Sequence, residues 1–426
     1  MPISRLTLRP DRAPRPRWRA QAIVFFVLAL VGLIGIAGLA IDGGRLALEK
    51  RRAQAAADAA ALAGGLSIAY APVQADGTVS ATALQAALDA ARERAAANGY
   101  DDDGVHNTVQ VTIDGPVQEG FHWVYYVNVD IDSNLDPALI QVVYSGPLRA
   151  SVHAQSRARP YQDFARGYTI VTTGDKSPGL QIGGDSLIDV EGDIWVNTWT
   201  RLNGSFTLQV DTLYSVGRVE NLGSASTLVG EVQANLGTPR TWPTIPEPAC
   251  GPDRGSIQGA RGGTYAPGTY SHIHINSDAE VHLEPGLYCV DHEVIITGGA
   301  VYGEGVMFYV RSGVVRLAGE AQVHLTAASN LTDAAGQQWR GMLFYLSPDN
   351  HDGFELRGTS EFYLDGTVYV PGEASREACA IAATSGTMSL QAQFICHSAE
   401  VVGTADMQLR QPSVAYHVPP VLDLTE

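Results

Sequence analysis

The feature that most constrains this chain is an uncharged apolar run from residue 22 to residue 41, AIVFFVLALVGLIGIAGLAI. A helix of this length spans about 30 Å, the hydrocarbon thickness of a bilayer. Backbone polar groups within lipid must be paired inside the segment, so helix is the expected conformation, with a buried core helix as the alternative. We predict a transmembrane helix over residues 22–41, with the anchor residues Ala22, Phe25, Phe26, Leu30, Ile34 and Ile41.

The charges that flank this run predict its orientation. Six arginines and one acid, Asp11, precede it between residues 5 and 19, and a mixed cluster of four bases and two acids follows it between residues 42 and 52. Because basic residues tend to stay on the cytoplasmic side, the six arginines favour a cytoplasmic tail over residues 1–21. We therefore expect a single-pass protein of the cell membrane, with the bulk of the chain outside the cytoplasm.

A cleaved secretory signal is the alternative reading of the same segment. Its apolar region is normally about 7–15 residues and is followed by a small-residue cleavage site. Here the run is longer and continues into LALEKRRAQAAADAAALAGG, in which alanine, the best helix former, dominates. We predict one long helix that crosses the membrane, projects outward to about residue 62 and ends at Gly64 and Gly65.

Residues 42–160 are predicted to combine this projecting helix with a small α+β, pilin-like unit. Residues 80–97 form an alanine-rich helical pattern that Ser80 can cap. Residues 109–113 and 124–131 alternate with the period of a strand. A short helix over 137–143 and a strand over 148–154 complete the unit.

Residues 168–426 have a different pattern, that of an all-β domain. Short apolar strands are separated by Gly, Asn, Asp and Ser, and no amphipathic helix is evident. The sequence PGTY at residues 267–270 recurs 18 residues later as PGLY, and a glycine followed by an apolar strand returns at Gly305, Gly341 and Gly366. A period of about 20 residues is typical of a solenoid, so we predict a parallel β-helix, with a β-sandwich as the alternative.

Charge and cysteine content restrict the partners and the compartment. Residues 1–52 carry a net charge of +7 and the remainder −24, for a total of −17, and this acidic bulk argues against nucleic acid as a partner. Four cysteines allow three disulfide connectivities outside the cytoplasm, or four buried thiols. Because coils of about 20 residues would bring cysteines 17 residues apart together, the disulfide candidates are paired as Cys379 with Cys396 and Cys250 with Cys289.

The sequence contains no strong catalytic motif. GxSxG, P-loop and HExxH patterns are absent, and no cysteine spacing suits a structural zinc site. We therefore predict a non-catalytic protein without catalytic residues, metal ligands or cofactor. Two other functions stay open: a carbohydrate-active β-helix enzyme of the cell surface, such as a polysaccharide lyase or hydrolase, and a surface adhesin.

The N-terminal segment resembles the TadG-like family of Flp (tight-adherence) pilus assembly. The resemblance covers residues 17–66 and is carried by AIDGGR at residues 40–45 and AADAAALA at residues 56–63. The family-motif residues are Asp42, Arg45, Ala57, Asp58, Ala61 and Leu62. The resemblance implies a membrane-anchored pilus-assembly component, with the lipid bilayer and other pilus-assembly membrane subunits as partners.

Two physical hypotheses follow for these motif residues. Asp42 would lie at the outer membrane interface, where its charge stops the helix from sliding inward. The small side chains of Ala57, Ala60 and Ala61 would let the helix of another membrane subunit approach closely, with Asp58 on the same seam or simply facing water.

Overall fold

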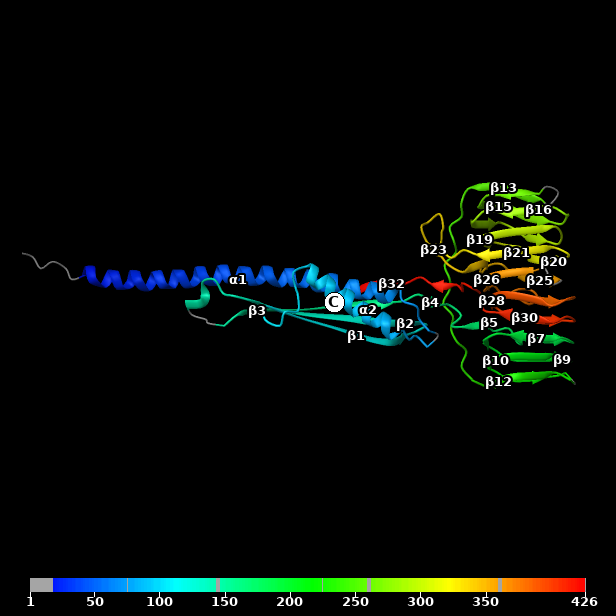
Figure 1. Ribbon diagram of the computed structural model, residues 1–426, viewed down its shortest axis with the longest axis horizontal. Helices are drawn as coiled ribbons and strands as arrows, with labels where there is room; N and C mark the ends of the chain where they lie inside the picture. Colours follow the sequence, from blue (N-terminus) through cyan, green and yellow to red (C-terminus); the bar gives the residue numbers. More distant parts are fainter. Residues whose placement is uncertain are drawn as a thin grey trace, which may run out of the picture.

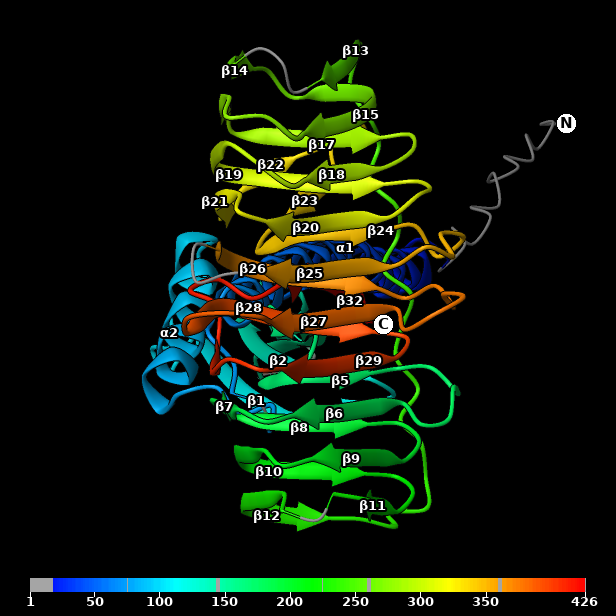
Figure 2. The ribbon, with the colours of Figure 1, turned by 90° about the vertical axis from the view of Figure 1, so that its right-hand side faces the viewer.

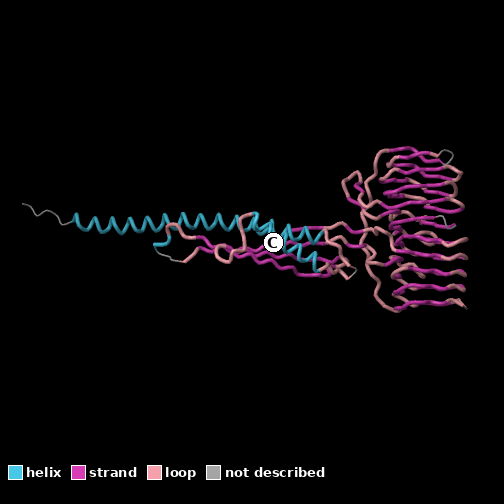
Figure 3. The backbone as a smooth tube through the Cα atoms, in the orientation of Figure 1, coloured by secondary structure: helices cyan, strands magenta, loops and turns pink. Residues whose placement is uncertain are grey.

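The computed structural model describes residues 18–74, 76–142, 146–223, 225–258, 262–358 and 362–425. It contains a long N-terminal helix, a second helix, a small antiparallel sheet and a large β-rich region with a long parallel sheet (Figure 1). We call the part of the long helix after residue 41, the second helix and the antiparallel sheet together the proximal unit. We call the large parallel sheet the strand stack. The proximal unit joins the strand stack near mid-height, and the long helix runs away from it across the direction of stacking (Figures 1 and 3).

The N-terminal helix α1, Trp18–Ala69, is longer than the sequence predicted. The predicted end at Gly64 and Gly65 is wrong, because both glycines lie inside the helix. A Cβ atom on Gly65 would come within 2.5 Å of the Ser156 side chain, and one on Gly64 within 2.9 Å of Val127. The missing side chains therefore let α1 lie close to the sheet beneath it.

The second helix, α2, extends over Ala81–Ala97, as predicted from the alanine-rich pattern. The Ser80 side chain caps it by accepting the backbone N–H of Ala83 at 3.2 Å. One face of α2 consists of alanines at helical spacing that pack against α1 and are fully buried: Ala87, Ala91 and Ala95.

A four-stranded antiparallel sheet lies under the two helices and contains the strands that the sequence predicted, each longer than expected. A three-residue 3-10 helix stands where a short helix was expected over 137–143. The elements of this layer are β1 (Asn107–Glu119), β2 (His122–Leu135), η1 (Ile140–Val142), β3 (Leu148–Arg159) and β32 (Val421–Thr425).

The end of the chain returns to this sheet, which differs from the predicted domain of residues 168–426. β32 pairs with β3 in antiparallel register, from Arg159 opposite Val421 to Gln155 opposite Thr425. A second two-stranded link joins β4 (Gln162–Asp163) to β31 (His417–Val418). The polypeptide thus enters and leaves the strand stack through the proximal unit.

The strand stack is a 24-stranded sheet in which the described strands pair in parallel. Its first part contains β5 (Tyr168–Thr172), β6 (Leu180–Gly184), β7 (Leu187–Val190), β8 (Asp193–Val196), β9 (Thr200–Gly204), β10 (Thr207–Ser215), β11 (Val219–Asn221) and β12 (Thr227–Gln233).

The second part of the stack follows a long connection, residues 234–252, which we call the crossover segment. It contains β13 (Asp253–Gln258), β14 (Gly263–Tyr265), β15 (Gly268–Ile275), β16 (Glu280–Leu283), β17 (Gly286–Val290), β18 (Val294–Ile296), β19 (Ala300–Val310), β20 (Val315–Gly319), β21 (Gln322–Ala327), β24 (Met342–Leu346), β25 (Phe354–Gly358), β26 (Phe362–Val370), β27 (Cys379–Ala383), β28 (Met388–Cys396), β29 (Ala399–Gly403) and β30 (Met407–Arg410). A side hairpin joins β22 (Leu331–Thr332) to β23 (Gln338–Trp339).

The order of strands in space differs from their order in the chain. The chain enters at mid-height with β5, descends to β12, crosses to β13 at the opposite end, and then returns to mid-height (Figure 2). There β28, β29 and β30 pair with β5, β6 and β7. Strands that are more than 200 residues apart in the chain are therefore paired in the middle of the stack.

The repeated PGTY and PGLY sequences produce a stack of aromatic rings in the core. Tyr270 lies on Tyr288 with ring centroids 5.9 Å apart, and Phe308 continues the stack at 5.5 Å. Gly268 and Gly286 precede these tyrosines with φ of +151° and +147°, where a side chain would be strained. The repeat seen in the sequence therefore marks equivalent positions in successive layers.

Candidate membrane anchor and surrounding surfaces

The predicted anchor residues form an exposed apolar surface on α1. Phe25 and Phe26 are 72% and 69% exposed, and Leu30, Ile34 and Ile41 are also exposed, while the side chain of Ala22 lies outside those described. Among the described helices, α1 from Ile23 onward is long and apolar enough to cross a membrane. Only 6% of its most apolar stretch is buried, which argues against a core helix.

Asp42 ties the end of the apolar run to the proximal unit. Its carboxylate accepts the backbone N–H groups of Ala138 at 2.9 Å, Leu139 at 2.9 Å and Ile140 at 2.7 Å. These donors lie at the start of the 3-10 helix Ile140–Val142, where N–H groups lack partners within the helix. With Asp42 only 1% exposed, its carboxylate holds the β2–β3 connection against α1, a role that the sequence did not indicate.

Two neighbours complete this contact. Arg45 donates to the Asp42 carboxylate at 3.4 Å and to the backbone carbonyl of Asp136 at 3.2 Å. Gly38 lies beside Leu139, where a Cβ atom would be 3.2 Å from the Leu139 Cβ. The β2–β3 connection therefore covers α1 where the apolar run ends, and it leaves Leu139 43% exposed beside that run.

The alanine seam of α1 is occupied by the chain itself, so the hypothesis that it receives another subunit is wrong. Ala57, Ala60 and Ala61 are fully buried, together with Ala53 and Ala56. They pack in one core with α2 and with the inner faces of β2 and β3. Small side chains allow close approach of any neighbour, and here the neighbours are the helix and sheet of the same chain.

The other two motif residues lie at the edge of this core. Asp58 is partly exposed and accepts the Gln54 side-chain amide at 2.9 Å, and the same amide also donates to the backbone carbonyl of His153. Leu62 is partly exposed on the next turn. The polar side of α1 is therefore also fastened to β3.

A shallow polar cleft of about 550 Å³ opens beside the second half of α1, next to residues 49–56. Glu49 lines it and accepts the Tyr100 hydroxyl at 3.0 Å and the Ser133 hydroxyl at 2.8 Å. Burial, reinforced by the Glu49 carboxylate, raises the pKa of Tyr100 to about 12, so this tyrosine stays protonated at neutral pH and donates a hydrogen bond to Glu49. Arg52 and His106 also line the cleft.

Aromatic rings and arginines pack at the joint between the proximal unit and the strand stack. The Arg166 guanidinium lies 4.6 Å from the Phe121 ring centroid, and that of Arg240 lies 3.8 Å from Trp195. His122 is partly buried beside them, and this burial, with nearby arginines second, lowers its pKa to about 4. The Arg166–Phe121 contact joins the β1–β2 turn of the proximal unit to the segment before β5, and the Arg240–Trp195 contact holds the crossover segment against β8.

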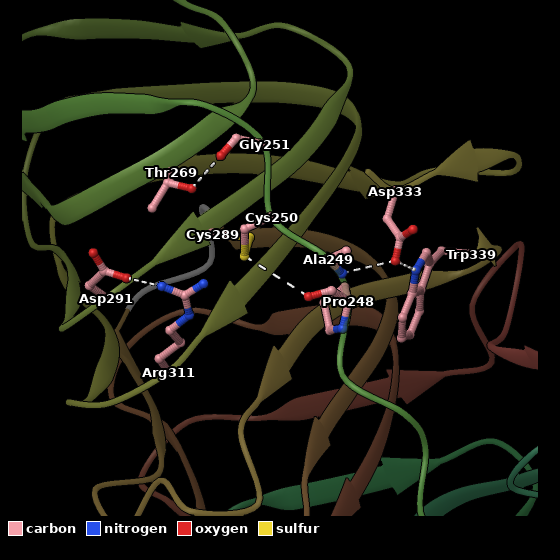
Figure 4. Close-up of a disulfide and its surroundings, with 10 residues drawn as sticks. All are labelled: Pro248, Ala249, Cys250, Gly251, Thr269, Cys289, Asp291, Arg311, Asp333 and Trp339. Atoms are coloured by element: carbon pink, nitrogen blue, oxygen red, sulfur yellow. Dashed lines mark hydrogen bonds and ion pairs between the residues drawn. A yellow bond between two sulfur atoms is a disulfide. The ribbon is translucent and has the colours of Figure 1, made fainter. Parts of the chain in front are cut away.

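Two disulfides are present, Cys250–Cys289 and Cys379–Cys396, in the pairing expected from the sequence spacing. Cys250 lies at the end of the crossover segment and Cys289 on β17, so this bond fastens the crossover to the face of the stack (Figure 4). Next to it, the Asp333 carboxylate accepts the Ala249 N–H at 2.9 Å and the Trp339 indole N–H at 3.2 Å.

The described ranges contain no group of three or more His, Cys, Asp or Glu side chains arranged to hold a metal ion. On the outer face of β20 and β25, the basic group of Arg316 is paired with the acidic group of Glu355. Arg316 donates to Glu355 at 2.8 Å, and this contact opposes burial and leaves the pKa of Glu355 below its ordinary value. Lys176 and Glu377 form a second pair at 3.3 Å.

The fold and the exposed helix define a class of protein, in which a β-rich region is carried on one candidate membrane-spanning helix. Residues 20–70 match the family model described as putative Flp pilus-assembly TadE/G-like, which confirms the family resemblance for this segment. The match covers nearly all of α1. A search of curated proteins and a search of solved structures found no match.

Proposed function

We propose that this protein is a non-catalytic, membrane-anchored component of Flp/Tad-type pilus assembly or surface adherence. The observation that carries the proposal is that the segment matching the TadE/G-like family coincides with α1, whose first half exposes its apolar side chains. The second half of α1 is the central helix of a folded unit. The helix therefore serves as anchor and as scaffold, and its partners are the lipid bilayer and other pilus-assembly membrane subunits.

We further propose that the N-terminus is cytoplasmic and the folded regions extracytoplasmic. The arginine-rich tail before the apolar run supports this orientation. Two disulfides support it independently, because disulfides persist in oxidising compartments outside the cytoplasm.

The strand stack is assigned as a parallel β-helix within this proposal. Its strands pair in parallel with strands one coil away, as when Val281 lies opposite Val301 and Val301 opposite Val323. A β-sandwich is built from antiparallel neighbours, whereas stacked coils bring parallel strands together. The coil offset of about 20 residues found in the sequence equals the offset of these pairs.

A structural rather than catalytic role for the strand stack is supported by two ion pairs on its outer surface. In the Arg316–Glu355 and Lys176–Glu377 pairs, each carboxylate already has a cationic partner. A polysaccharide lyase needs a free base and cations that hold uronates. Activity of the purified protein on uronic-acid polymers would contradict the non-catalytic proposal.

Complementation of a strain that lacks this protein tests the function. We expect loss of surface pili by electron microscopy and recovery with the wild-type gene. Leu33→Arg, which places a charge on an exposed position in the apolar run, should remove the protein from the membrane fraction and prevent recovery. Leu48→Arg, on the exposed surface beyond the run, is the matched control and should restore pili. Normal piliation without the protein would overturn the proposal.

Thiol labelling of intact spheroplasts tests the orientation. A membrane-impermeant maleimide should label Glu320→Cys, in the exposed turn after β20, before lysis. Ser4→Cys in the N-terminal tail should be labelled only after lysis. The opposite pattern would reverse the orientation.

A further inference from the structure

We propose that the strand stack associates end to end with a second copy of this chain, the β11–β12 end of one copy meeting the β13–β14 end of the next. The contact is heterologous, so repetition produces a row of molecules rather than a closed dimer. This inference goes beyond the pilus-assembly proposal and does not depend on it, since it rests on the two ends of the sheet.

Both ends of the stack present unpaired parallel edges. In the described part of the chain, β12 pairs with β10 and β11 with β9, while at the other end β13 pairs with β15 and β14 with β16. Figure 2 shows β11 and β12 at the bottom of the stack and β13 and β14 at the top. An open edge of this kind is a template for another strand unless it is blocked.

The two ends are complementary in register. From one layer to the next, each residue of Gln258's column is paired with a residue of the following layer, and this column continues without a break to Glu220 at the other end. The positions of the two end layers therefore correspond to one another. A second column connects Asp253 to Gln233 on the face toward the proximal unit. The first column contains Gln258, His274, Ile295, Arg316, Glu355, Ala380, Glu400, Gln181, Arg201 and Glu220.

Because strands in both end layers run in the same direction, translation of a copy along the stack places its β13 below β11 and β12 as the next parallel layer. Gln258 of that copy then lies opposite Glu220, and Asp253 lies opposite Gln233. The end contact thereby repeats the pairing that already joins each layer to the next.

The side chains at the two ends favour this pairing of unlike ends. The β11–β12 end exposes large apolar residues and carries two acids, Glu231 and Glu220, of which Glu220 pairs with Arg218 at 3.5 Å. The β13 end is polar and exposes Arg254. When unlike ends meet, neutral glutamines lie opposite both Glu220 and Asp253, so no like charges face each other in the two columns. The exposed apolar residues of the first end are Leu222 (57%), Val229 (48%), Val232 (41%) and Leu236 (38%).

The position of the anchor permits a row on one membrane. The proximal unit joins the stack near mid-height, so neither end is covered by it (Figure 1). α1 runs across the stacking direction, and a copy displaced along the stack keeps its own α1 parallel to the first (Figures 1 and 2). Anchors of successive copies thus enter the same bilayer, and the row lies along the membrane surface.

Cysteine cross-linking of the full-length chain in membranes tests the contact. Neighbours in a parallel pair lie within the Cα separation that a disulfide requires. Membranes containing Glu220→Cys and Gln258→Cys chains together should give an oxidised dimer on non-reducing gels, and a chain carrying both substitutions should give a ladder of multimers. Neither single variant alone should cross-link.

An internal cross-link within one chain is the control for this experiment. Arg201→Cys with Glu220→Cys places two cysteines one layer apart within a chain, so its internal disulfide shows that position 220 reacts in this geometry. With that bond formed, absence of a Glu220→Cys/Gln258→Cys dimer overturns the proposal. A dimer from Glu220→Cys alone also overturns it, in favour of like ends meeting.

A charge on the free edge gives a second test. Val229→Lys in the double-cysteine chain should abolish the ladder, because lysine on an edge strand blocks strand addition. Gln209→Lys, exposed one layer further in on the same column, is the matched control and should leave the ladder unchanged. A ladder that survives Val229→Lys contradicts contact through β12. Because the readout is independent of pili, failure here leaves the pilus-assembly proposal standing.

Discussion

The Ser156 hydroxyl donates a 2.6 Å hydrogen bond to the backbone carbonyl of Ala61, and so joins β3 to the interior of α1. Both residues are completely buried. One turn further along the helix, Gly65 leaves the space that the Ser156 side chain fills. The alanine-rich half of α1 is therefore a helix fitted to its own sheet.

This fit predicts that Gly65→Leu destabilises the proximal unit by about 1–3 kcal/mol, as overpacking of a close interface typically does. The new side chain meets Ser156 at 2.5 Å and Leu422 at 2.6 Å from its Cβ atom. Thermal unfolding of the full chain in detergent, followed by circular dichroism, measures the effect. Gly43→Leu is the control, since no atom lies within 4 Å of a Cβ there; equal melting temperatures for the two variants would contradict the packing.

Removing the Asp42 carboxylate should release the β2–β3 connection. Asp42→Ala leaves the N–H groups of Leu139 and Ile140 without their acceptor, so their amide hydrogens should exchange faster. Hydrogen exchange with mass spectrometry on peptides covering residues 136–142 measures this. Asp58→Ala removes a carboxylate that accepts only from the Gln54 side chain and should not change these peptides. Equal exchange in Asp42→Ala and wild type would show that the contact contributes little.

The Cys250–Cys289 disulfide should protect the crossover segment from proteolysis. It closes a loop of 39 residues, against 17 for Cys379–Cys396, and removal of such a bond typically costs about 2–4 kcal/mol. We expect limited proteolysis to cut within residues 234–252 faster in the Cys250→Ala/Cys289→Ala chain. The Cys379→Ala/Cys396→Ala chain is the comparison, because its bond joins two strands already held in the stack. Mass spectrometry of non-reduced peptides should recover both links, and any other pairing would contradict the structure.

Local patterns in the sequence were sufficient to predict the helices and strands of the proximal unit, but not which elements pack against each other. The alanines that predicted a helix, Ala57 and Ala61, gave no indication of what would cover them, because small side chains suit any close neighbour equally. The structure shows that α2 and β3 of the same chain do so. The same ambiguity made Gly64 and Gly65 look like a helix end.

Long-range pairing was not predictable for a related reason. The PGTY repeat indicated coils because equivalent positions recur about 20 residues apart. Nothing local marks the pairing of β28 with β5, where Ile395 lies opposite Val171, or the return of Val421–Thr425 to the first sheet. Such contacts depend on where distant strands find open edges. The cysteines were an exception, since the coil spacing that suggested the fold also paired them.

The partly buried imidazole of His122 predicts a pH dependence of stability. Burial, with the charges of Arg159 and Arg166, lowers its pKa from 6.5 to about 4, so the unfolded chain binds a proton that the folded chain does not between these values. Stability should therefore fall as pH decreases from about 6.5 to 4, level off below that, and be fully retained above 6.5. Because the side chain is partly exposed, we expect a loss on the order of 1–2 kcal/mol. Comparing the melting temperature of wild type with His122→Gln at pH 7.5 and pH 4.5 isolates this contribution from that of other groups. The variant should lose less stability on acidification, and an identical loss in both chains would show that His122 titrates at its ordinary pKa.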